Sequence, residues 1–340
     1  MIPASWVVNF EMQQKTIHQK RIWIAWERQR RSLELSRCFQ CKLFLIIKKG
    51  VLRYPYSIIK TLLIINQERP DVLFVQNPSM ILAFFTTLVF RPFFNYKIVV
   101  DRHSNFLLTP KKRFFLFEAF FHFLSFTTIR FADLTIVTNP QLASVVNILG
   151  GKGKILPDKI PALSPSGSKH LIGRRNVLVI SSFAKDEPVD EIIKTAAEFV
   201  SGDVYFYFTG NYERYHDVDS LKNVDNIVLT GYVPEQKFVD LLFAADVVMV
   251  LTQMEYTLLC GCYEAVAAEK ILITSDTFTL RSLFQGAIFV QNKRKSIKNG
   301  VQYAFNNRKE LICDIKELKR TMSESWKVYF EEIINDIFLC

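Results

Sequence analysis

The sequence contains no apolar run long enough to cross a lipid bilayer. An uncharged run at 80–90 has only 11 residues, whereas a spanning helix needs about 20. The first 20 residues lack a basic segment followed by an apolar core, so we expect no secretory signal peptide. Neither an internal repeat nor a low-complexity tract is present. These absences favour an ordinary globular protein of the cytoplasm.

Cysteine is sparse, with six residues scattered over 340. In a chain without a signal peptide, this pattern indicates reduced thiols and not a disulfide framework. Cys38 and Cys41 form one C-x-x-C pair, which supplies two ligands where structural zinc needs four. Cys260 and Cys262 bracket Gly261, and we interpret them as small side chains that fill space around the glycine.

Positive charge is concentrated in the front half. Residues 1–130 hold 20 Lys+Arg against 7 Asp+Glu, a net +13, whereas the remainder holds 23 against 26, a net −3. The chain also contains 30 Phe. A basic, aromatic half indicates either nucleic acid or an anionic membrane as partner. No nucleic-acid module is recognisable and the basic residues adjoin apolar runs, so we favour the membrane.

One segment could mediate that contact. Residues 114–129 are nearly all apolar but include Glu118 and His122, and three basic residues at 111–113 precede them. This composition is typical of a helix that lies in a membrane interface. A buried core helix is the alternative.

Short apolar runs alternate with helical patterns along the whole chain, which is typical of parallel βαβ construction. We therefore predict an α/β fold with two doubly wound, Rossmann-like domains that face each other across a cleft. The expected strands are 21–26, 42–47, 72–76, 97–100, 134–137 and 155–156, then 176–181, 204–209, 226–229, 247–251, 271–274 and 287–290.

A segment rich in Pro and Ser separates the two halves and ends near residue 169. The predicted domains are 1–160 and 170–320, with a linker at 161–169. Residues 321–340 carry an amphipathic helical pattern that could return to the first domain.

Four motifs in the back half occur in a characteristic order: Gly231-Tyr232-Val233-Pro234, Ala245-Asp246-Val247, Glu264 to Ile273, and Ser275-Asp276. This order resembles the donor-binding domain of GT-B glycosyltransferases, especially the family 4 group. In the front half the segments VLFVQNPS, IVVDRHSNF and TIVTNPQLASVV are more loosely similar. The QNPS and DRHSNF pair also resembles the β-mannosyltransferases that act on lipid-linked chitobiose.

The resemblance implies a nucleotide-sugar site around Glu264. This carboxylate would accept hydrogen bonds from ribose hydroxyls; alternatively, it is an ordinary glutamate that complements a helix dipole. Thr257 and Leu258 precede the helix whose N–H groups would hold the diphosphate, and Gly261 would let ligand oxygens approach. No metal or cofactor is expected, because helix termini and basic side chains can neutralise the leaving diphosphate.

Further donor contacts are expected from the ends of other strands. Tyr232 and Val233 resemble the turn that holds the nucleobase. Gly210 ends a strand where backbone can approach a ligand closely, and Ser182 follows another strand. Lys185 lies near the place where family members carry a phosphate-binding lysine, although acidic residues adjoin it.

Two departures from the family are visible. A glutamate usually precedes the ribose-binding one by eight residues, but Tyr256 occupies that position and Glu255 lies one residue earlier. The first strand–helix turn, usually rich in glycine, contains none here. Arg28 and Arg31 in that turn could grip the phosphates of an acceptor, or they could simply start a solvated basic helix.

Catalytic candidates follow strands of the front half. His103 and Asp101 lie at the end of one strand, where His103 could serve as general base and Asp101 as its orienting partner or as the alternative base. Glu255 is the third candidate. Asn77 and Ser79 follow another strand and would face the acceptor.

The sequence thus predicts a metal-independent hexosyltransferase that acts on a lipid-linked or glycan acceptor at the inner face of a membrane. Its partners would be a nucleotide sugar such as a UDP- or GDP-sugar, the acceptor and the membrane surface, without nucleic acid. A non-catalytic GT-B-like binding subunit and a sugar-nucleotide epimerase of the same fold are the alternatives.

Overall fold

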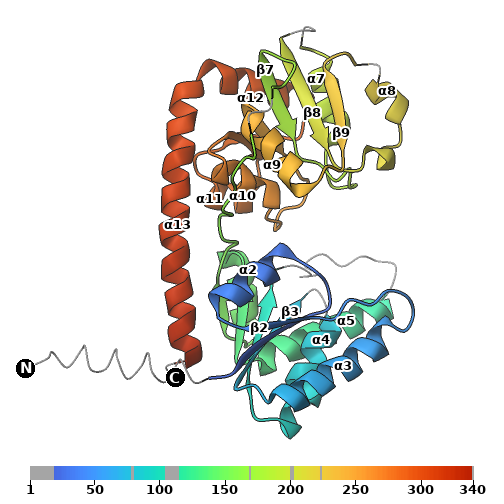
Figure 1. Cartoon of the computed structure of the whole chain (residues 1–340), viewed down its shortest axis with the longest axis vertical. Helices are drawn as coiled ribbons and strands as arrows, with labels where there is room; N and C mark the ends of the chain where they lie inside the picture. The colour runs from blue at the N-terminus through green and yellow to red at the C-terminus, as the bar shows by residue number, and fades with distance from the viewer. Residues whose placement is uncertain are drawn as a thin grey trace, which may run out of the picture. The chain divides into compact units, whose positions relative to one another are not determined.

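The computed structural model describes residues 19–77, 80–103, 115–167, 170–199, 203–222 and 224–338. The chain forms two compact units, both visible in Figure 1. Unit 1 comprises Met1–Lys159 and Trp326–Cys340, and unit 2 comprises Ile160–Ser325.

Unit 1 is built on a six-stranded parallel sheet in the order β2-β1-β3-β4-β5-β6. Its central strands are continuous apolar runs because helices cover both faces of the sheet. The strands are β1 (Arg21–Ala25), β2 (Lys42–Leu45), β3 (Val72–Asn77), β4 (Lys97–Arg102), β5 (Leu134–Val137) and β6 (Gly153–Ile155). The helices are α2 (Arg30–Cys38), α3 (Arg53–Glu68), α4 (Met80–Phe84), α5 (Phe115–Phe131) and α6 (Pro140–Ile148).

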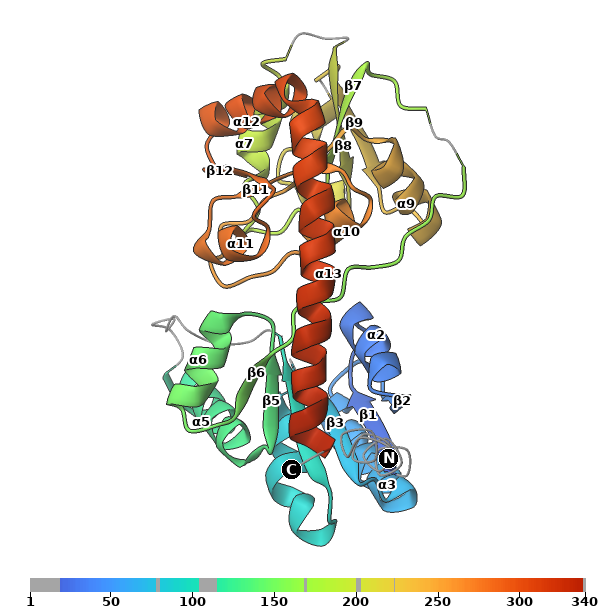
Figure 2. The ribbon, with the colours of Figure 1, turned by 90° about the vertical axis from the view of Figure 1, so that its left-hand side faces the viewer.

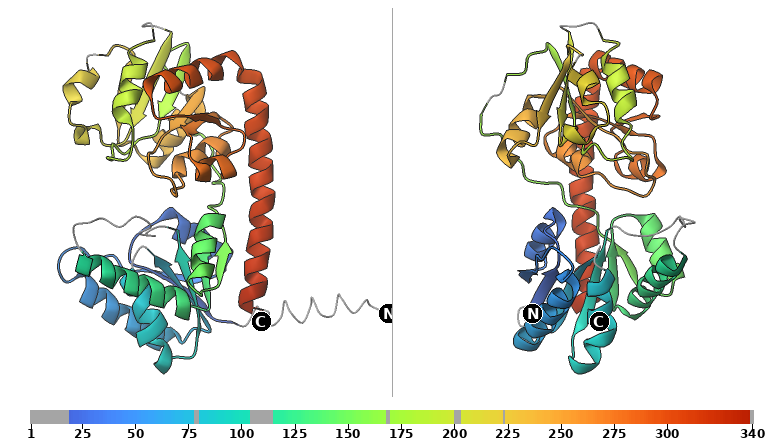
Figure 3. Two further views of the ribbon diagram at one scale, coloured as in Figure 1. Left: turned by 180° about the vertical axis from the view of Figure 1, so that it is seen from behind. Right: turned by 90° about the vertical axis from the view of Figure 1, so that its right-hand side faces the viewer.

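Alternate residues of β1 face opposite sides of this sheet, as a strand's period of two requires. Ile22 and Ile24 pack towards α3 and α4, whereas Trp23 packs with Phe39 and Phe74 on the α2 side. α3, α4 and α5 form one layer, seen in Figures 1 and 3. The apolar run at 80–90 is α4 plus a π-helical turn at Phe85–Val89, and it packs largely inside this layer.

Unit 2 has a second six-stranded parallel sheet in the order β12-β11-β10-β7-β8-β9. Its strands are β7 (Arg175–Val179), β8 (Val204–Thr209), β9 (Ile227–Gly231), β10 (Val247–Val250), β11 (Ile271–Ser275) and β12 (Ile288–Val290). Its helices are α7 (Val189–Ala196), α8 (Val218–Lys222), α9 (Glu235–Ala244), α10 (Cys260–Ala267), α11 (Phe278–Leu283) and α12 (Arg294–Asn306). The prediction of two doubly wound α/β domains is confirmed.

The two faces of the second sheet bury separate clusters. One cluster contains α7 and α12, and the other contains α9, α10 and α11. This separation decides which loops can meet at the edge of the sheet.

The last helix, α13 (Arg308–Phe338), is the long red helix of Figure 2. It includes the helix expected from residue 321 onward and begins 13 residues earlier. Its final turns belong to unit 1, where Trp326, Ile333 and Ile337 join the cluster around Trp23. The Trp326 indole N–H donates to the Pro157 carbonyl at 3.1 Å. In the described part of the chain, no helix combines the length and apolarity that crossing a bilayer requires.

Candidate functional site

The carboxyl ends of β7 and β10 meet where the order of strands in unit 2 reverses. From β7 the chain builds outward first through β8 and β9, and then on the other side through β10, β11 and β12. Ligands of open parallel sheets bind outside the carboxyl ends of the strands at such a switch point. The predicted donor residues follow these strands, so the candidate site is assembled from their loops.

The loop after β7 wraps around the carboxylate of Glu187. The Ser181 hydroxyl donates to it at 2.5 Å and the Ser182 hydroxyl at 2.7 Å, while the backbone N–H groups of Ser182 and Phe183 donate at 3.0 Å. Phe183 has a left-handed φ of 56°, a conformation that turns successive N–H groups towards one point to form an anion nest. Glu187 therefore occupies donors that could otherwise bind a phosphate.

A hydrogen-bonded network fixes three neighbouring strand ends. Ser275 Oγ accepts from the Thr252 N–H at 2.9 Å and donates to Asn292 Oδ1 at 2.8 Å, and the Asn292 amide donates to the Thr252 carbonyl at 2.7 Å. The Thr252 hydroxyl also donates to Asp186 at 3.0 Å, which ties the loop after β7 to β10. Rigid strand ends of this kind support a preorganised site.

The backbone around Gly210, which directly follows β8, requires a glycine at this position. Its φ is 88°, and a Cβ placed there would lie 2.0 Å from the Ser181 carbonyl oxygen. Its N–H donates to the Gly231 carbonyl at 3.1 Å. The close approach that Gly210 permits is thus to the protein's own backbone, whereas the prediction placed a ligand there.

α10 begins without a side-chain cap. Leu259 is its N-cap residue and supplies no side-chain hydrogen bond, although its carbonyl accepts from the Cys262 N–H at 3.0 Å. The positive end of the helix dipole favours an anion at this point. Thr257 and Leu258 lie half-buried just before the helix, and Glu264 is half-buried in its second turn. Their predicted contacts with the diphosphate and the ribose stay predictions.

Gly261 has a packing role within α10. A Cβ there would lie 3.0 Å from Val250 Cγ2 and 3.1 Å from Ile180 Cδ1, so glycine lets the helix approach the sheet. The expected approach of ligand oxygens to Gly261 stays a prediction, since these contacts concern only the side on which a Cβ would lie. Cys262 is buried 3.5 Å from the Thr274 hydroxyl, and burial raises the pKa of its thiol to about 12. It is a neutral filler.

Three further predicted residues differ in their surroundings. Tyr232 is 77% exposed, whereas Val233 packs onto the α9–α10 face. Glu255 Oε1 accepts from the Thr279 N–H at 3.0 Å and so stabilises the start of α11. Tyr256, at the position where the family carries its first glutamate, is about half exposed.

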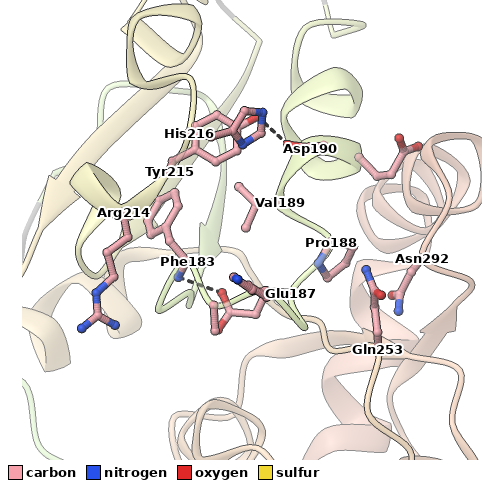
Figure 4. Close-up of a pocket in the computed structure, with 13 residues that line it drawn as sticks. Phe183, Glu187, Pro188, Val189, Asp190, Arg214, Tyr215, His216, Gln253 and Asn292 are labelled. Carbon is pink, nitrogen blue, oxygen red and sulfur yellow. Dashed lines mark hydrogen bonds between the residues drawn. The ribbon is translucent and has the colours of Figure 1, made fainter. Parts of the chain in front are cut away.

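A cavity of about 430 Å³ opens at the same edge on the α7 side, drawn in Figure 4. Lys185 is the one predicted donor residue among those that line it. Its other polar lining residues were not predicted: Glu187, Asp190, Glu191, Arg214, Tyr215, His216, Gln253 and Asn292. The Tyr215 hydroxyl donates to Asp190 at 2.6 Å. Such a mixture of cations, carboxylates and amides suits a polyhydroxylated ligand.

Arg214 and His216 were missed because they belong to none of the motifs, although they follow Gly210 by four and six residues, and only the fold of the loop after β8 brings them to α7. The sequence offered one weak signal, a run of polar and aromatic residues directly after the glycine that ends β8. Loops carry function more often than strands do.

In unit 1, Asp101 and His103 project from one face of β4 and the residue that follows it. His103 Nδ1 lies 3.3 Å from Asp101 Oδ2, at ion-pair distance but not aligned as a hydrogen bond. Arg102 points to the other face, where its guanidinium donates to the Ser125 hydroxyl at 2.5 Å. The structure thus brings the two predicted catalytic residues together.

Arg31 completes this cluster from α2. Its Nε donates to both Asp101 oxygens at 2.9 and 3.1 Å, its Nη1 to Asp158 at 2.7 Å and its Nη2 to the Leu156 carbonyl at 2.8 Å. Burial by itself raises the pKa of Asp101, but the Arg31 charge and the neighbouring His103 side chain outweigh burial and hold that pKa below its ordinary value. The guanidinium faces its own chain, which favours a positioning role over the predicted grip on acceptor phosphates.

The remaining acceptor-side predictions are less defined. Arg28 is exposed in the turn before α2. Asn77 ends β3, and Ser79 lies outside the described residues. Gln76, just before Asn77, is buried and donates to the Gln29 side chain, which links β3 to the same turn.

The chain is similar in three dimensions to solved glycosyltransferase structures. Sucrose-phosphate synthase from Thermosynechococcus elongatus aligns over 86% of this chain and 82% of its own, at 13% identity and a TM-score of 0.67. HepE of Anabaena in complex with UDP and glucose aligns over 96% and 94%, at 12% identity and a TM-score of 0.69. A glycosyltransferase from Rickettsia africae aligns over 97% and 93%, at 11% identity and a TM-score of 0.66. The chain has the GT-B fold.

No protein-family model matches the chain, and no curated protein sequence matches it. At these identities the likeness defines the GT-B architecture alone, because one fold can carry unrelated activities. Activity must therefore be argued from the site.

Proposed function

We propose that this GT-B protein is a glycosyltransferase that moves a hexose from a nucleotide-diphosphate sugar to an acceptor hydroxyl. The observation that carries the proposal is the uncapped start of α10 at the switch point, with Glu264 one turn further along. A helix N-terminus binds phosphate, and a fixed carboxylate on the same helix can accept bonds from ribose hydroxyls. The motif order that resembles family 4 enzymes supports the same assignment.

His103 is the proposed general base. It would take the proton of the acceptor hydroxyl while that oxygen bonds to the anomeric carbon and the nucleoside diphosphate leaves. Asp101 would orient the imidazole and stabilise its charged form. Arg31 is a positioning residue, because its guanidinium holds Asp101 in place. Backbone N–H groups of α10 would stabilise the leaving diphosphate without a metal.

The acceptor is proposed to be lipid-linked or membrane-proximal, as in glycan assembly. The net charge of +13 over residues 1–130 supports this, as does the resemblance of QNPS and DRHSNF to enzymes that act on lipid-linked chitobiose. α5 exposes Phe120, Phe123 and Phe126, which fits contact with an apolar interface.

Donor binding is the direct test. Titration calorimetry with UDP, UDP-glucose, GDP and GDP-mannose should reveal one nucleotide that binds and that also raises the melting temperature. Glu264→Gln should weaken this binding roughly tenfold to hundredfold, because it removes charge-assisted bonds to the ribose. Glu310→Gln is the matched control, since Glu310 is exposed in the first turn of α13, a helix that carries no predicted donor residue.

A non-catalytic subunit is the second candidate. It is favoured by Glu187, which fills the donors of the loop after β7, and by Glu255, which is bound to the start of α11. If none of the four nucleotides binds or shifts the melting temperature, the transferase proposal fails and this candidate gains.

A further inference from the structure

α3 presents an inverted pattern of side chains. Its buried face carries Ser57 and Thr61, both fully buried, together with Ile65, and the Trp26 indole N–H donates to the Thr61 hydroxyl at 3.0 Å. A surface helix normally buries its apolar stripe and exposes polar residues. Here hydroxyl side chains occupy positions that face the sheet.

The outer face of α3 is apolar instead. Tyr56, Ile59 and Leu63 recur at spacings of three and four, and Leu52 lies one turn earlier on the same side. Their exposed fractions are 41%, 58%, 53% and 69%. Val51, in the loop before the helix, is 95% exposed. An exposed apolar stripe of this kind is typical of an interaction surface.

Basic residues border the stripe, and acidic residues are absent from the segment. Residues 46–67 contain Lys48, Lys49, Arg53 and Lys60 but no Asp or Glu. Arg53 pairs with Glu27, whereas the three lysines form no ion pair within the described residues. Lys48 and Lys60 lie 5.5 and 6.0 Å from the Tyr56 ring.

We propose that α3 and the preceding loop, residues 46–67, dock this protein on an anionic lipid bilayer. The apolar stripe would enter the boundary between headgroups and acyl chains, and the lysines would meet lipid phosphates. A second copy of the chain fits less well, because two such faces would bring six lysine charges together without a counter-charge. Nucleic acid also fits less well, because its backbone could pair with the lysines but would place the apolar stripe against a polar surface.

This surface deepens the proposed function by giving its membrane contact a location, and it differs from the segment at 114–129 that the sequence favoured. α5 lies in the same layer of helices (Figures 1 and 3) and also exposes Phe side chains. α3 has lysines beside its apolar stripe within the described residues, whereas the basic residues 111–113 that precede α5 lie outside them.

The test is co-sedimentation of the full chain with phosphatidylcholine vesicles that contain phosphatidylglycerol, compared with phosphatidylcholine alone. We expect binding to the anionic vesicles that falls as salt rises. Lys48→Gln with Lys49→Gln should weaken it roughly 30-fold, about fivefold for each lysine. Leu52→Ser with Ile59→Ser should abolish it. Circular dichroism should show that both variants stay folded, since all four side chains are exposed.

Ile148→Ser and Lys237→Gln are matched controls, because both side chains are exposed on other elements. Binding that survives both α3 variants, or no binding to either vesicle, would overturn the proposal. A dimer that dissociates in Leu52→Ser with Ile59→Ser would overturn it too and assign the face to a second copy. The assay contains no sugar donor, so its failure would leave the transferase proposal standing, and a failure of donor binding would leave the docking surface standing.

Discussion

At the scale of single residues, the buried cluster of Arg31, Asp101 and Asp158 dominates unit 1. Asp101 is fully buried and Arg31 nearly so. Burial opposes the charge of Arg31, but the two carboxylates outweigh that effect and raise its pKa further above the ordinary value. A buried ion pair of this kind is costly to break from one side, because the remaining charge loses its partner inside the protein.

Asp101→Asn should destabilise unit 1 by roughly 3 kcal/mol at neutral pH. The pKa of Asp101 is lowered in the folded state, so its contribution is fully present above the unfolded value of about 3.9 and is lost as pH falls through the folded value. Urea unfolding should therefore show a lower free energy of unfolding for the variant than for the wild type at pH 7. This difference should narrow only below about pH 4.

Glu324→Gln serves as the control for this comparison. Glu324 forms an exposed ion pair with Arg320 on α13, and such pairs contribute less than about 1 kcal/mol. If Asp101→Asn lowered the free energy of unfolding by as little as this control does, the proposed stabilisation would be contradicted.

At the scale of elements, the loop after β7 and the end of β8 depend on each other. Ser181 donates to Glu187, and its carbonyl lies against Gly210. The left-handed conformations of Phe183 and Gly210 therefore belong to one compact junction at the switch point.

Gly210→Ala should destabilise unit 2 by about 3 kcal/mol or more. The added Cβ would clash with the Ser181 carbonyl, and its φ of 88° is one that side chains rarely adopt. Urea unfolding followed by circular dichroism measures the change. Gly167→Ala is the control, because nothing lies within 4 Å of a Cβ there. Equal stabilities for the two variants would show that the junction relaxes freely.

At the scale of the whole molecule, unit 1 is made from two distant parts of the chain. Its core needs Trp326, Ile333, Ile337 and Phe338 from the end of α13. The Lys97 ammonium also donates to the Ile337 carbonyl at 2.9 Å. Unit 2, in contrast, is continuous from Ile160 to Ser325.

A chain that ends at Ser325 should lose the fold of unit 1 and keep that of unit 2. The four missing core side chains contribute roughly 2 kcal/mol each, which is comparable with the total stability of a domain. None of the four Trp of the sequence, at 6, 23, 26 and 326, lies within the range of unit 2. Tryptophan emission should therefore shift to that of an unfolded chain while a cooperative circular-dichroism transition persists. Native emission from the shortened chain would contradict this.

Most of the architecture could be predicted from the sequence. The expected strands 204–209 and 134–137 coincide with β8 and β5, and the others differ from the observed strands by at most two residues at either end. A continuous apolar run such as Val247–Val250 favours a strand of a parallel sheet, because such strands are buried on both faces. The apolar run at 80–90 was expected only to be too short to span a bilayer; its helical structure was not predicted.

The site was predicted less completely. Asp101 and His103 share one strand, so a period of two already placed them together. Arg31 contacts Asp101 over 70 residues and Asp158 over 127, and Glu187 binds backbone that only the folded loop presents. Gly210 and Gly261 were expected to admit a ligand, but neighbouring backbone and side chains explain both.

The sequence by itself determined the alternation of strands and helices and hence the two parallel sheets, because local hydrophobic patterns depend on near neighbours along the chain. Only the tertiary structure decided which charges became partners, which glycines were needed for packing, and which face of α3 stayed exposed. Those outcomes depend on side chains brought together from distant segments, and a helix pattern does not state which of its faces meets the sheet. In α3, the face that carries Ser57 and Thr61 is buried, so Ile59 and Leu63 on the outer face are exposed to solvent.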